Sequence, residues 1–224
     1  MKWDANQGIF NSVLEAIGRT PMIRLNRLTA GVNPDICVKM EFANPSGSLK
    51  DRVVHTIVER AEQRGDLKPG MILLEGTTGN TGIATAMVGA AKNYRVIIVM
   101  PEGMSEERKK TIRAYGAELV LTPGAETDVD LVLVEVEKIK KTYGDQIFEI
   151  GQFCREDNLN AHIENTAPEI WEQTNGKVDV FIMCQGTGGT VTGNAKYLKE
   201  KNPNIKIYIS EPADSPILSQ GRIG

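Results

Sequence analysis

The stretch NPSGSLKDR, residues 44–52, organises the chain around one lysine. Its proline and glycine mark a turn, and Ser48 followed by Asp51 three residues later is typical of a capped helix start. We therefore expect a helix that ends before Gly65 and holds Lys50 in its first turn. A cation there opposes the helix dipole at a cost of roughly 0.3–1 kcal/mol, which a neutral imine on the same nitrogen largely avoids. The position favours a chemically modified lysine, although an isolated lysine is more often a solvated surface residue.

Composition is that of an ordinary globular protein and points to small-molecule chemistry. The chain has 224 residues, of which 41% are hydrophobic and 25% are charged, with a net charge of −3. Its lysines and arginines are scattered, so we expect neither a nucleic-acid partner nor a membrane partner. No stretch approaches the ~20 apolar residues that cross a bilayer. These features predict a cytoplasmic protein, long enough for one large core or two modest domains.

The cysteines and histidines give no sign of a disulfide framework or a metal site. The three cysteines lie far apart and are odd in number. Cys37 and Cys184 stand in apolar runs and are expected in the core, whereas Cys154 could be a reactive thiol. With only two histidines and no Cys-x-x-Cys pair, we expect no metal.

Short apolar runs alternate with amphipathic segments along most of the chain, which indicates an α/β fold with parallel sheets covered on both faces. Strands are expected at residues 36–42, 71–75, 95–100, 118–121, 147–150, 178–184 and 205–210. Helices are expected at residues 80–92, 105–115, 129–143, 163–174 and 190–201. Two clusters of these units, before and after about Phe153, predict two lobes, with ligands bound beyond the carboxyl ends of the strands.

Residues 75–82, EGTTGNTG, form a second turn between a strand and a helix. Free backbone N–H groups at a helix N-terminus, together with the hydroxyls and the Asn80 amide, would bind a carboxylate or a ring hydroxyl. A generously capped helix is the competing interpretation.

Residues 184–193, CQGTGGTVTG, give the strongest phosphate-binding signal in the chain. Successive glycines let backbone amides approach an anion, and the helix that follows adds its positive end. A dinucleotide site, for NAD, is an alternative, because Glu211 follows the next strand where a ribose-binding acid would stand. However, the Gly-x-Gly-x-x-Gly pattern counted from Gly186 lands on Val191, so the third glycine is missing. The loop alone does not separate NAD from a phosphorylated vitamin.

The three turns together contain the parts that pyridoxal phosphate and an amino acid require. A lysine can form a Schiff base with the cofactor, a glycine loop can anchor its phosphate, and a hydroxyl-rich turn can hold the substrate carboxylate. This chemistry needs neither a metal nor a catalytic triad. The combination predicts a pyridoxal-phosphate enzyme that acts on an amino acid.

Six motifs, spread over essentially the whole chain, carry a family resemblance. They are NPSGSLKDR at 44–52, TTGNTG at 77–82, MPEGMSEER at 100–108, QF at 152–153, PEIW at 168–171 and GTGGT at 186–190. Together they resemble the cysteine synthase (O-acetylserine sulfhydrylase) and cystathionine β-synthase family of fold-type II pyridoxal-phosphate enzymes. The resemblance implies a two-lobed fold similar to tryptophan synthase β, in which each lobe is a mainly parallel sheet flanked by helices.

The resemblance also implies where the lobes lie. Residues 44–153 would form the smaller lobe, with a mobile part at about 96–140 that closes on the substrate carboxylate. Residues 1–43 and 154–224 would form the larger lobe. Family members continue past the point that matches Gly224 and there supply a group to the pyridine nitrogen, so we expect the larger lobe to be incomplete at its C-terminus.

Site residues carry over from the family position by position. Lys50 would form the Schiff base and, once displaced by the substrate, remove the α-proton. Asn80 would bond the ring hydroxyl of the cofactor. The substrate carboxylate would be held by Thr77, Thr78, Thr81 and Gln152. The cofactor phosphate would be held by Gly186, Thr187, Gly188, Gly189 and Thr190.

The implied reaction is a β-replacement in which O-acetyl-L-serine loses acetate and sulfide adds to give L-cysteine. The implied partners are a second copy of the chain and the C-terminal tail of serine acetyltransferase. Thr78 stands where the family usually has serine, and residues 154–158 and 165–167 depart from the usual cysteine synthase pattern. One alternative is therefore cystathionine β-synthase activity, which joins serine or acetylserine to homocysteine. A second alternative, motivated by the missing C-terminal part, is a non-catalytic module that binds a peptide.

Overall fold

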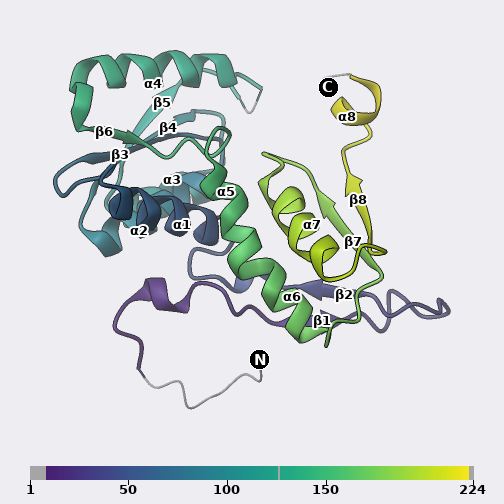
Figure 1. Cartoon of the computed structure of the whole chain (residues 1–224). Helices are drawn as coiled ribbons and strands as arrows, with labels where there is room; N and C mark the ends of the chain where they lie inside the picture. The colour runs from purple at the N-terminus through teal and green to yellow at the C-terminus, as the bar shows by residue number, and fades with distance from the viewer. Residues whose placement is uncertain (1–8, 126, 222–224) are drawn as a thin grey trace. The chain divides into compact units, whose positions relative to one another are not determined.

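The computed structural model describes residues 9–125 and 127–221 (Figure 1). These residues form two compact units, residues 9–152 and residues 153–221, termed here the first and the second unit. The assignment of residues 1–43 to a larger lobe stays a prediction. Its first eight residues, like residues 222–224, lie outside the described part of the chain.

A four-stranded parallel sheet forms the centre of the first unit, with the strand order β5-β4-β3-β6. Its strands are β3 (Ile72–Gly76), β4 (Arg95–Pro101), β5 (Glu118–Thr122) and β6 (Ile147–Glu149). The two central strands are buried along almost their whole length, which explains why their sequences are continuous apolar runs. The expected parallel sheet is confirmed.

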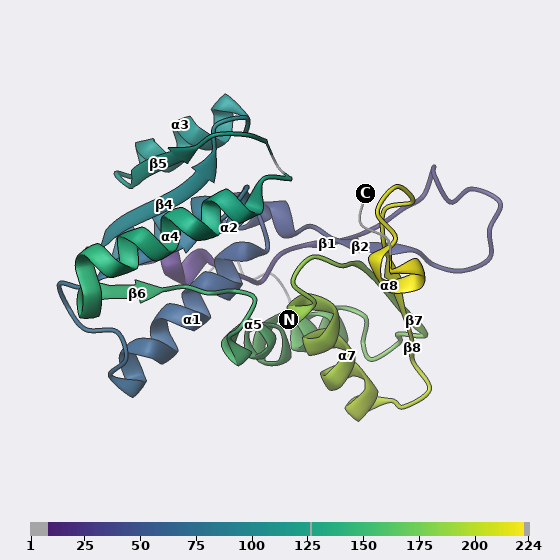
Figure 2. The same cartoon turned by 90° about the horizontal axis from the view of Figure 1, so that it is seen from above.

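Helices cover both faces of this sheet, as Figures 1 and 2 show. One face carries α2 (Asn80–Lys92), with α1 (Lys50–Arg64) and α3 (Glu106–Ala114) beside it, and the other carries α4 (Val129–Tyr143). Gly89 lets α2 approach the sheet closely, because a Cβ atom there would lie 2.2 Å from Val96 Cγ2.

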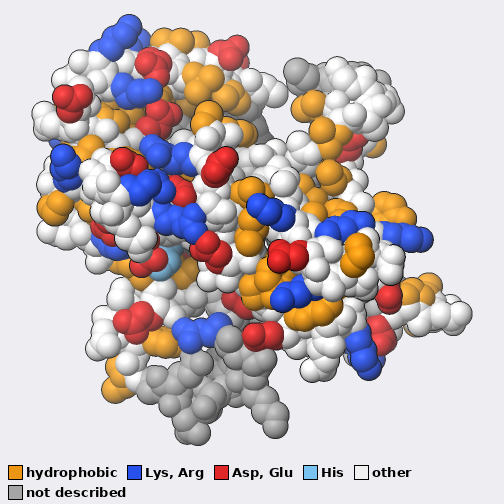
Figure 3. All heavy atoms as spheres, viewed as in Figure 1, with side chains coloured by type: hydrophobic (Ala, Val, Ile, Leu, Met, Phe, Trp, Pro, Cys, Tyr) orange, Lys and Arg blue, Asp and Glu red, His pale blue; other side chains and the backbone are white. Residues whose placement is uncertain are grey.

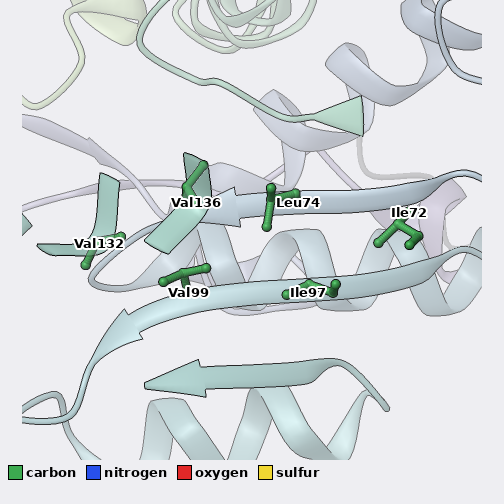
Figure 4. Close-up of a cluster of buried hydrophobic side chains, with 6 residues drawn as sticks. All are labelled: Ile72, Leu74, Ile97, Val99, Val132 and Val136. Carbon is green, nitrogen blue, oxygen red and sulfur yellow. The ribbon is translucent and has the colours of Figure 1, made fainter. Parts of the chain in front are cut away.

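An aliphatic layer fills the space between the sheet and α4 (Figure 4). Its buried members are Ile72, Leu74, Ile97, Val99, Val132 and Val136. Each buried side chain of this size contributes roughly 1.5–3 kcal/mol to folding. Because side chains alternate along a strand, Leu73 and Glu75 of β3 point to the opposite face, which α2 covers.

The first unit begins with smaller elements that lead into the lysine turn. They are η1 (Val13–Ala16), the antiparallel pair β1 (Met22–Arg24) and β2 (Cys37–Lys39), and η2 (Glu41–Ala43). The strand expected at residues 36–42 is therefore shorter, because η2 takes its last residues. Cys37 is exposed rather than buried, since its strand belongs to a sheet of only two strands. One more short helix, η3 (Gly144–Gln146), precedes β6.

The second unit combines a two-stranded parallel sheet with helices. One helical stretch runs through α5 (Glu156–Ala161), the π-helical η4 (His162–Thr166) and α6 (Ala167–Gln173). The sheet pairs β7 (Val180–Cys184) with β8 (Lys206–Ser210), the two strands are connected by α7 (Gly189–Lys201), and α8 (Ile217–Gln220) follows. The helix expected at 163–174 thus starts seven residues earlier than predicted, and Cys184 is exposed rather than in the core.

Charges on one face of the protein are mixed in sign. On the face drawn in Figure 3, Lys and Arg side chains are interspersed with Asp and Glu. Among the residues that the structure describes, no helix is long and apolar enough to cross a membrane. Within the same residues, no group of three His, Cys, Asp or Glu side chains is placed to hold a metal ion.

Candidate active site

Lys50 is the first residue of α1, in the first turn as expected. Its backbone N–H donates to Ser48 Oγ at 3.2 Å, so Ser48 satisfies the first N–H of the helix. The expected pairing of Ser48 with Asp51 is wrong. Asp51 instead accepts hydrogen bonds from the backbone N–H of Ser46, at 2.7 Å, and from the Ser46 hydroxyl. The turn at Gly47, with φ of +89°, folds Ser46 back over the helix start and makes this contact possible.

The amine of Lys50 lies in a half-buried environment near an acidic side chain. Burial lowers the pKa of Lys50, and the charge of Glu75 opposes this shift. A lower pKa increases the uncharged fraction of the amine, and only the uncharged amine can attack a carbonyl carbon. This environment suits a nucleophilic lysine.

An ion pair between a buried arginine and a half-buried glutamate anchors the start of α1. Arg52 is 2% exposed and donates to the Glu41 carboxylate through Nε at 2.7 Å and through Nη2 at 2.9 Å. Nη2 also donates to Thr20 Oγ1 at 3.2 Å, and Asn44 Nδ2 donates to Glu41 Oε2 at 3.0 Å. Burial raises the pKa of Glu41, but the hydrogen bonds and charge of Arg52 outweigh it and hold that pKa below its usual value. These supporting residues were not among those expected from the sequence, because only the folded chain brings η2 against α1.

The candidate carboxylate ligands lie on the turn between β3 and α2. Thr77 and Thr78 are half-buried, and Asn80 at the start of α2 is exposed. Thr77 Oγ1 accepts the backbone N–H of Gly79 at 3.2 Å, which fixes the shape of the turn. Behind the turn lies the N-terminus of a 13-residue helix, where backbone N–H groups favour an anion.

Gln152 joins this turn through side-chain hydrogen bonds. Thr81 Oγ1 donates to Gln152 Oε1 at 2.8 Å, and both residues are buried. Gln152 Nε2 in turn donates to Glu75 Oε1 at 3.1 Å, and the backbone N–H of Gly151 donates to Glu75 Oε2 at 3.0 Å. The structure therefore brings together Thr81 and Gln152, two of the four expected carboxylate ligands.

Glu75 was not among the site residues expected from the sequence. It lies near the end of β3 and is 3% exposed. Burial raises the pKa of Glu75 to about 8, and the charge of Glu149 adds to this rise. The charge of Lys50 and the hydrogen bonds that Glu75 accepts oppose the rise. The signal in the sequence was an acid at the end of the apolar run MILLEG, since a buried acid with a perturbed pKa is typical of a functional site.

The glycine-rich loop lies in the second unit, between β7 and α7. Gly188 has φ of +82°, a conformation that favours glycine. A Cβ atom at Gly186 or Gly188 would meet no described atom within 4 Å, so space is open beside the loop backbone. The loop also precedes the N-terminus of a 13-residue helix, and this combination fits a phosphate group.

Side chains from α5 and η4 hold the loop. Asn158 Nδ2 donates to Thr187 Oγ1 at 2.8 Å. Thr190 Oγ1 lies 3.1 Å from Nε2 of the fully buried His162, whose Nδ1 lies 2.9 Å from Thr166 Oγ1. The sequence did not point to Asn158 or His162, because no helix was expected between residues 150 and 163.

The expected site residues thus fall into two groups, one in each unit. The first unit contains Lys50, the threonine turn with Asn80, and Gln152, while the second contains residues 186–190. An amine with a lowered pKa, a turn suited to a carboxylate and an open glycine loop are the groups that pyridoxal phosphate and an amino acid require. The residues present therefore fit this cofactor.

Comparisons with known proteins point the same way. A family model described as pyridoxal-phosphate dependent enzyme matches residues 13–223. The chain is 43% identical to a cysteine synthase of Staphylococcus aureus over 215 residues, which make up 96% of this chain and 68% of that protein.

Two solved structures extend this similarity to three dimensions. A hydrogen sulfide-producing enzyme from Fusobacterium nucleatum is 44% identical, with a TM-score of 0.89 over 97% of this chain and 70% of that one. The cysteine synthase (OASS) from Entamoeba histolytica is 43% identical, with a TM-score of 0.91 over 97% of this chain and 65% of that one.

Proposed function

The chain belongs to the fold-type II pyridoxal-phosphate dependent enzymes, and on this basis we propose that it catalyses a β-replacement that makes L-cysteine from O-acetyl-L-serine and sulfide. The observation that carries the proposal is the environment of Lys50. A half-buried lysine with a lowered pKa begins α1, in the same compact unit as a threonine turn and Gln152. These are the side chains that an amine-linked cofactor and an amino-acid carboxylate need.

Lys50 would have two roles. When bound, pyridoxal phosphate supplies an electron sink for the Cα atom of the amino acid. Lys50 Nζ would carry the cofactor and, once the substrate amino group has taken its place, would accept the Cα proton. Acetate would then leave Cβ with its bonding electrons, sulfide would add to the same carbon, and the proton held on Lys50 Nζ would return to Cα to give L-cysteine.

The other residues would bind and orient. Thr77, Thr78, Thr81 and Gln152 would hold the carboxylate, so that the Cα–H bond points at Lys50 Nζ. Asn80 would bond the ring hydroxyl, and residues 186–190 would hold the phosphate through backbone N–H groups and hydroxyls. Residues 96–140, of which 126 lies outside the described part of the chain, would close over the substrate and exclude water.

Replacing Lys50 tests this proposal. We expect Lys50→Ala to reduce formation of cysteine from O-acetyl-L-serine and sulfide by at least about a hundredfold, the low end of what a positioned proton-transfer group contributes. The matched control is Lys110→Ala, because Lys110 is exposed on α3 and its loss should leave turnover unchanged. Undiminished activity of Lys50→Ala, with pyridoxal phosphate in excess, would contradict the proposed role.

Two observations favour a nucleophile other than sulfide in the β-replacement. The relative from Fusobacterium nucleatum is described as hydrogen sulfide-producing, and Thr78 adds a methyl group where the family usually has serine. Cystathionine β-synthase chemistry, with homocysteine as the nucleophile, is therefore the alternative. Competition of sulfide against homocysteine, with serine and with O-acetylserine as donors, would separate the two by their kcat/KM values.

The family resemblance supports two further parts of the proposal, a homodimer and binding of the serine acetyltransferase tail, and the three scattered cysteines fit a cytoplasmic location. Light scattering of the purified protein would test the dimer, and titration with a peptide of that tail would test the partner. Peptide binding without any binding of pyridoxal phosphate would favour the non-catalytic alternative.

A further inference from the structure

The hydrogen bonds around Glu75 require two acceptors. The backbone N–H of Gly151 donates to one carboxyl oxygen at 3.0 Å, and Gln152 Nε2 donates to the other at 3.1 Å. An ionised carboxylate only accepts hydrogen bonds, so it satisfies both donors. A protonated carboxyl group offers one good acceptor and one O–H donor, so it satisfies Gly151 but meets the Gln152 amide with a donor.

The Gln152 side-chain amide can accommodate protonation of Glu75 by flipping, which exchanges the positions of Oε1 and Nε2. The flip is possible because the two ends of the amide are nearly the same in shape. With Glu75 ionised, Nε2 faces Glu75, and Oε1 accepts the hydroxyl proton of Thr81 at 2.8 Å. With Glu75 protonated, Oε1 would accept from the carboxyl O–H, and Nε2 would donate to Thr81 Oγ1. The hydroxyl proton of Thr81 would then be released for another acceptor.

We propose that Glu75 is a positioning residue: its carboxyl group sets the orientation of the Gln152 amide, and thereby decides whether Thr81 offers a donor to an amino-acid carboxylate. The inference rests on the proposed function, in which Thr81 and Gln152 hold that carboxylate. Only the flipped amide releases the Thr81 O–H. A neutral Glu75 also spares the substrate carboxylate the repulsion of a buried anion.

Charged groups on neighbouring elements set the pH at which this change occurs. Burial raises the pKa of Glu75 to about 8, with Glu149 of β6 adding to the rise and Lys50 of α1 opposing it. From α2, the side chain that joins the network is the uncharged Thr81. The proton is therefore present at neutral pH and lost as the pH rises above about 8. Affinity for the amino acid should be full below that pH and should fall above it.

Nitrogen NMR on protein labelled in glutamine side chains tests the orientation directly, without reference to activity. The Gln152 amide signal, assigned by its loss in Gln152→Leu, should shift in the wild type with a midpoint near pH 8. In Glu75→Gln the signal should not titrate, and it should lie at the low-pH position of the wild type. The wild-type titration needs only Gln152→Leu, for the assignment, so poor folding of Glu75→Gln would not obscure it.

Glu149→Gln is the matched control. Glu149 pairs with Lys140 at 2.9 Å, and its charge raises the pKa of Glu75. Its neutralisation should therefore keep the titration of the Gln152 signal and move the midpoint to lower pH. A wild-type signal that does not change with pH, or an equal titration in Glu75→Gln, would overturn the inference.

Binding of L-serine to the cofactor-loaded protein tests the consequence for the substrate. Above the midpoint, wild-type affinity should fall by about tenfold per pH unit relative to Glu75→Gln, because binding then requires uptake of one proton. Titration of the serine amino group affects both proteins alike. If the affinity for L-serine had the same pH dependence in the wild type and in Glu75→Gln, the proposed effect of Glu75 on binding of the substrate carboxylate would be overturned. A wild type that binds neither L-serine nor the proposed product L-cysteine at any pH would instead contradict the proposed function, and the NMR titration alone would decide the role of Glu75.

Discussion

The two groups of candidate site residues are supported by different kinds of side chain. Behind Lys50 and Gln152 in the first unit lie buried or half-buried groups that are charged or titratable: the Arg52–Glu41 pair and Glu75. Behind the glycine loop in the second unit lie amides, hydroxyls and the imidazole of His162, and residues 184–193 contain no lysine or arginine. The difference implies that the lysine-bearing part depends mainly on charged side chains, whereas the loop depends mainly on backbone dipoles and uncharged side chains, with the His162 imidazole as the titratable group beside it.

The largest effect expected from this difference follows from breaking the Arg52–Glu41 ion pair. Arg52→Met would leave Glu41 as a half-buried charge without its ion-pair partner, which should lower the free energy of unfolding by up to roughly 3–5 kcal/mol. Urea unfolding at neutral pH measures this change. The matched control is Arg64→Met, because Arg64 forms an exposed pair with Asp66 at 2.9 Å whose loss should cost about 0–1 kcal/mol. An equal decrease in the free energy of unfolding in the two variants would show that burial does not strengthen the Arg52–Glu41 pair.

Acid should reduce the difference between Arg52→Met and the wild type. The folded chain holds the pKa of Glu41 below its usual value, so the stabilisation by the pair is fully present above that usual value. It is lost as the pH falls through the lowered pKa, because Glu41 then becomes neutral in both proteins. A difference that stays constant down to pH 3 would contradict this explanation.

A smaller effect is expected from the glycine loop. In Gly189→Ala the new Cβ atom would lie 2.3 Å from Asn158 Oδ1, and Asn158 is the residue that holds Thr187. Overpacking of this kind should lower the free energy of unfolding by roughly 1–3 kcal/mol. Gly186→Ala is the matched control, because its Cβ atom would meet no described atom within 4 Å and should change stability by about 0.5 kcal/mol or less.

The pH dependence of these glycine variants sharpens the comparison. Each glycine variant should change the free energy of unfolding by a similar amount at pH 6 and at pH 9. In contrast, the Gln152 NMR signal should differ between Glu75→Gln and the wild type at pH 9 but not at pH 6. A loss in Gly189→Ala that changed strongly between these two pH values would mean that the loop also depends on a titrating group.

Local signals in the sequence were enough to predict most elements of the fold. The helix from Lys50 ends where Gly65 adopts φ of +77°, a conformation that the glycine allows. The expected helix at 80–92 and the strands around it also appear. Apolar runs and clusters of small residues can be recognised within a few consecutive positions of the sequence, so these elements could be predicted. The early start of α5 was missed because this helix buries the polar Asp157 and Asn158, so it has little apolar periodicity.

Contacts between distant residues could not be predicted in the same way. Glu75 and Gly151 are separated by 76 positions, and no local pattern indicates that they share a hydrogen bond. Asp51 was paired with the wrong serine, since the turn geometry at Gly47 decides which hydroxyl reaches it. The sequence therefore indicated candidate residues for the site, but it could not indicate the partners that support them.

The attachment point of the cofactor tests the central claim most directly. Purified protein would be incubated with pyridoxal phosphate, reduced with sodium borohydride and digested, and the peptides would be analysed by mass spectrometry. We expect the mass of the reduced cofactor on the peptide that contains Lys50, and no such label in Lys50→Ala. Label on another lysine, or an unlabelled Lys50 peptide in the wild type, would contradict the account.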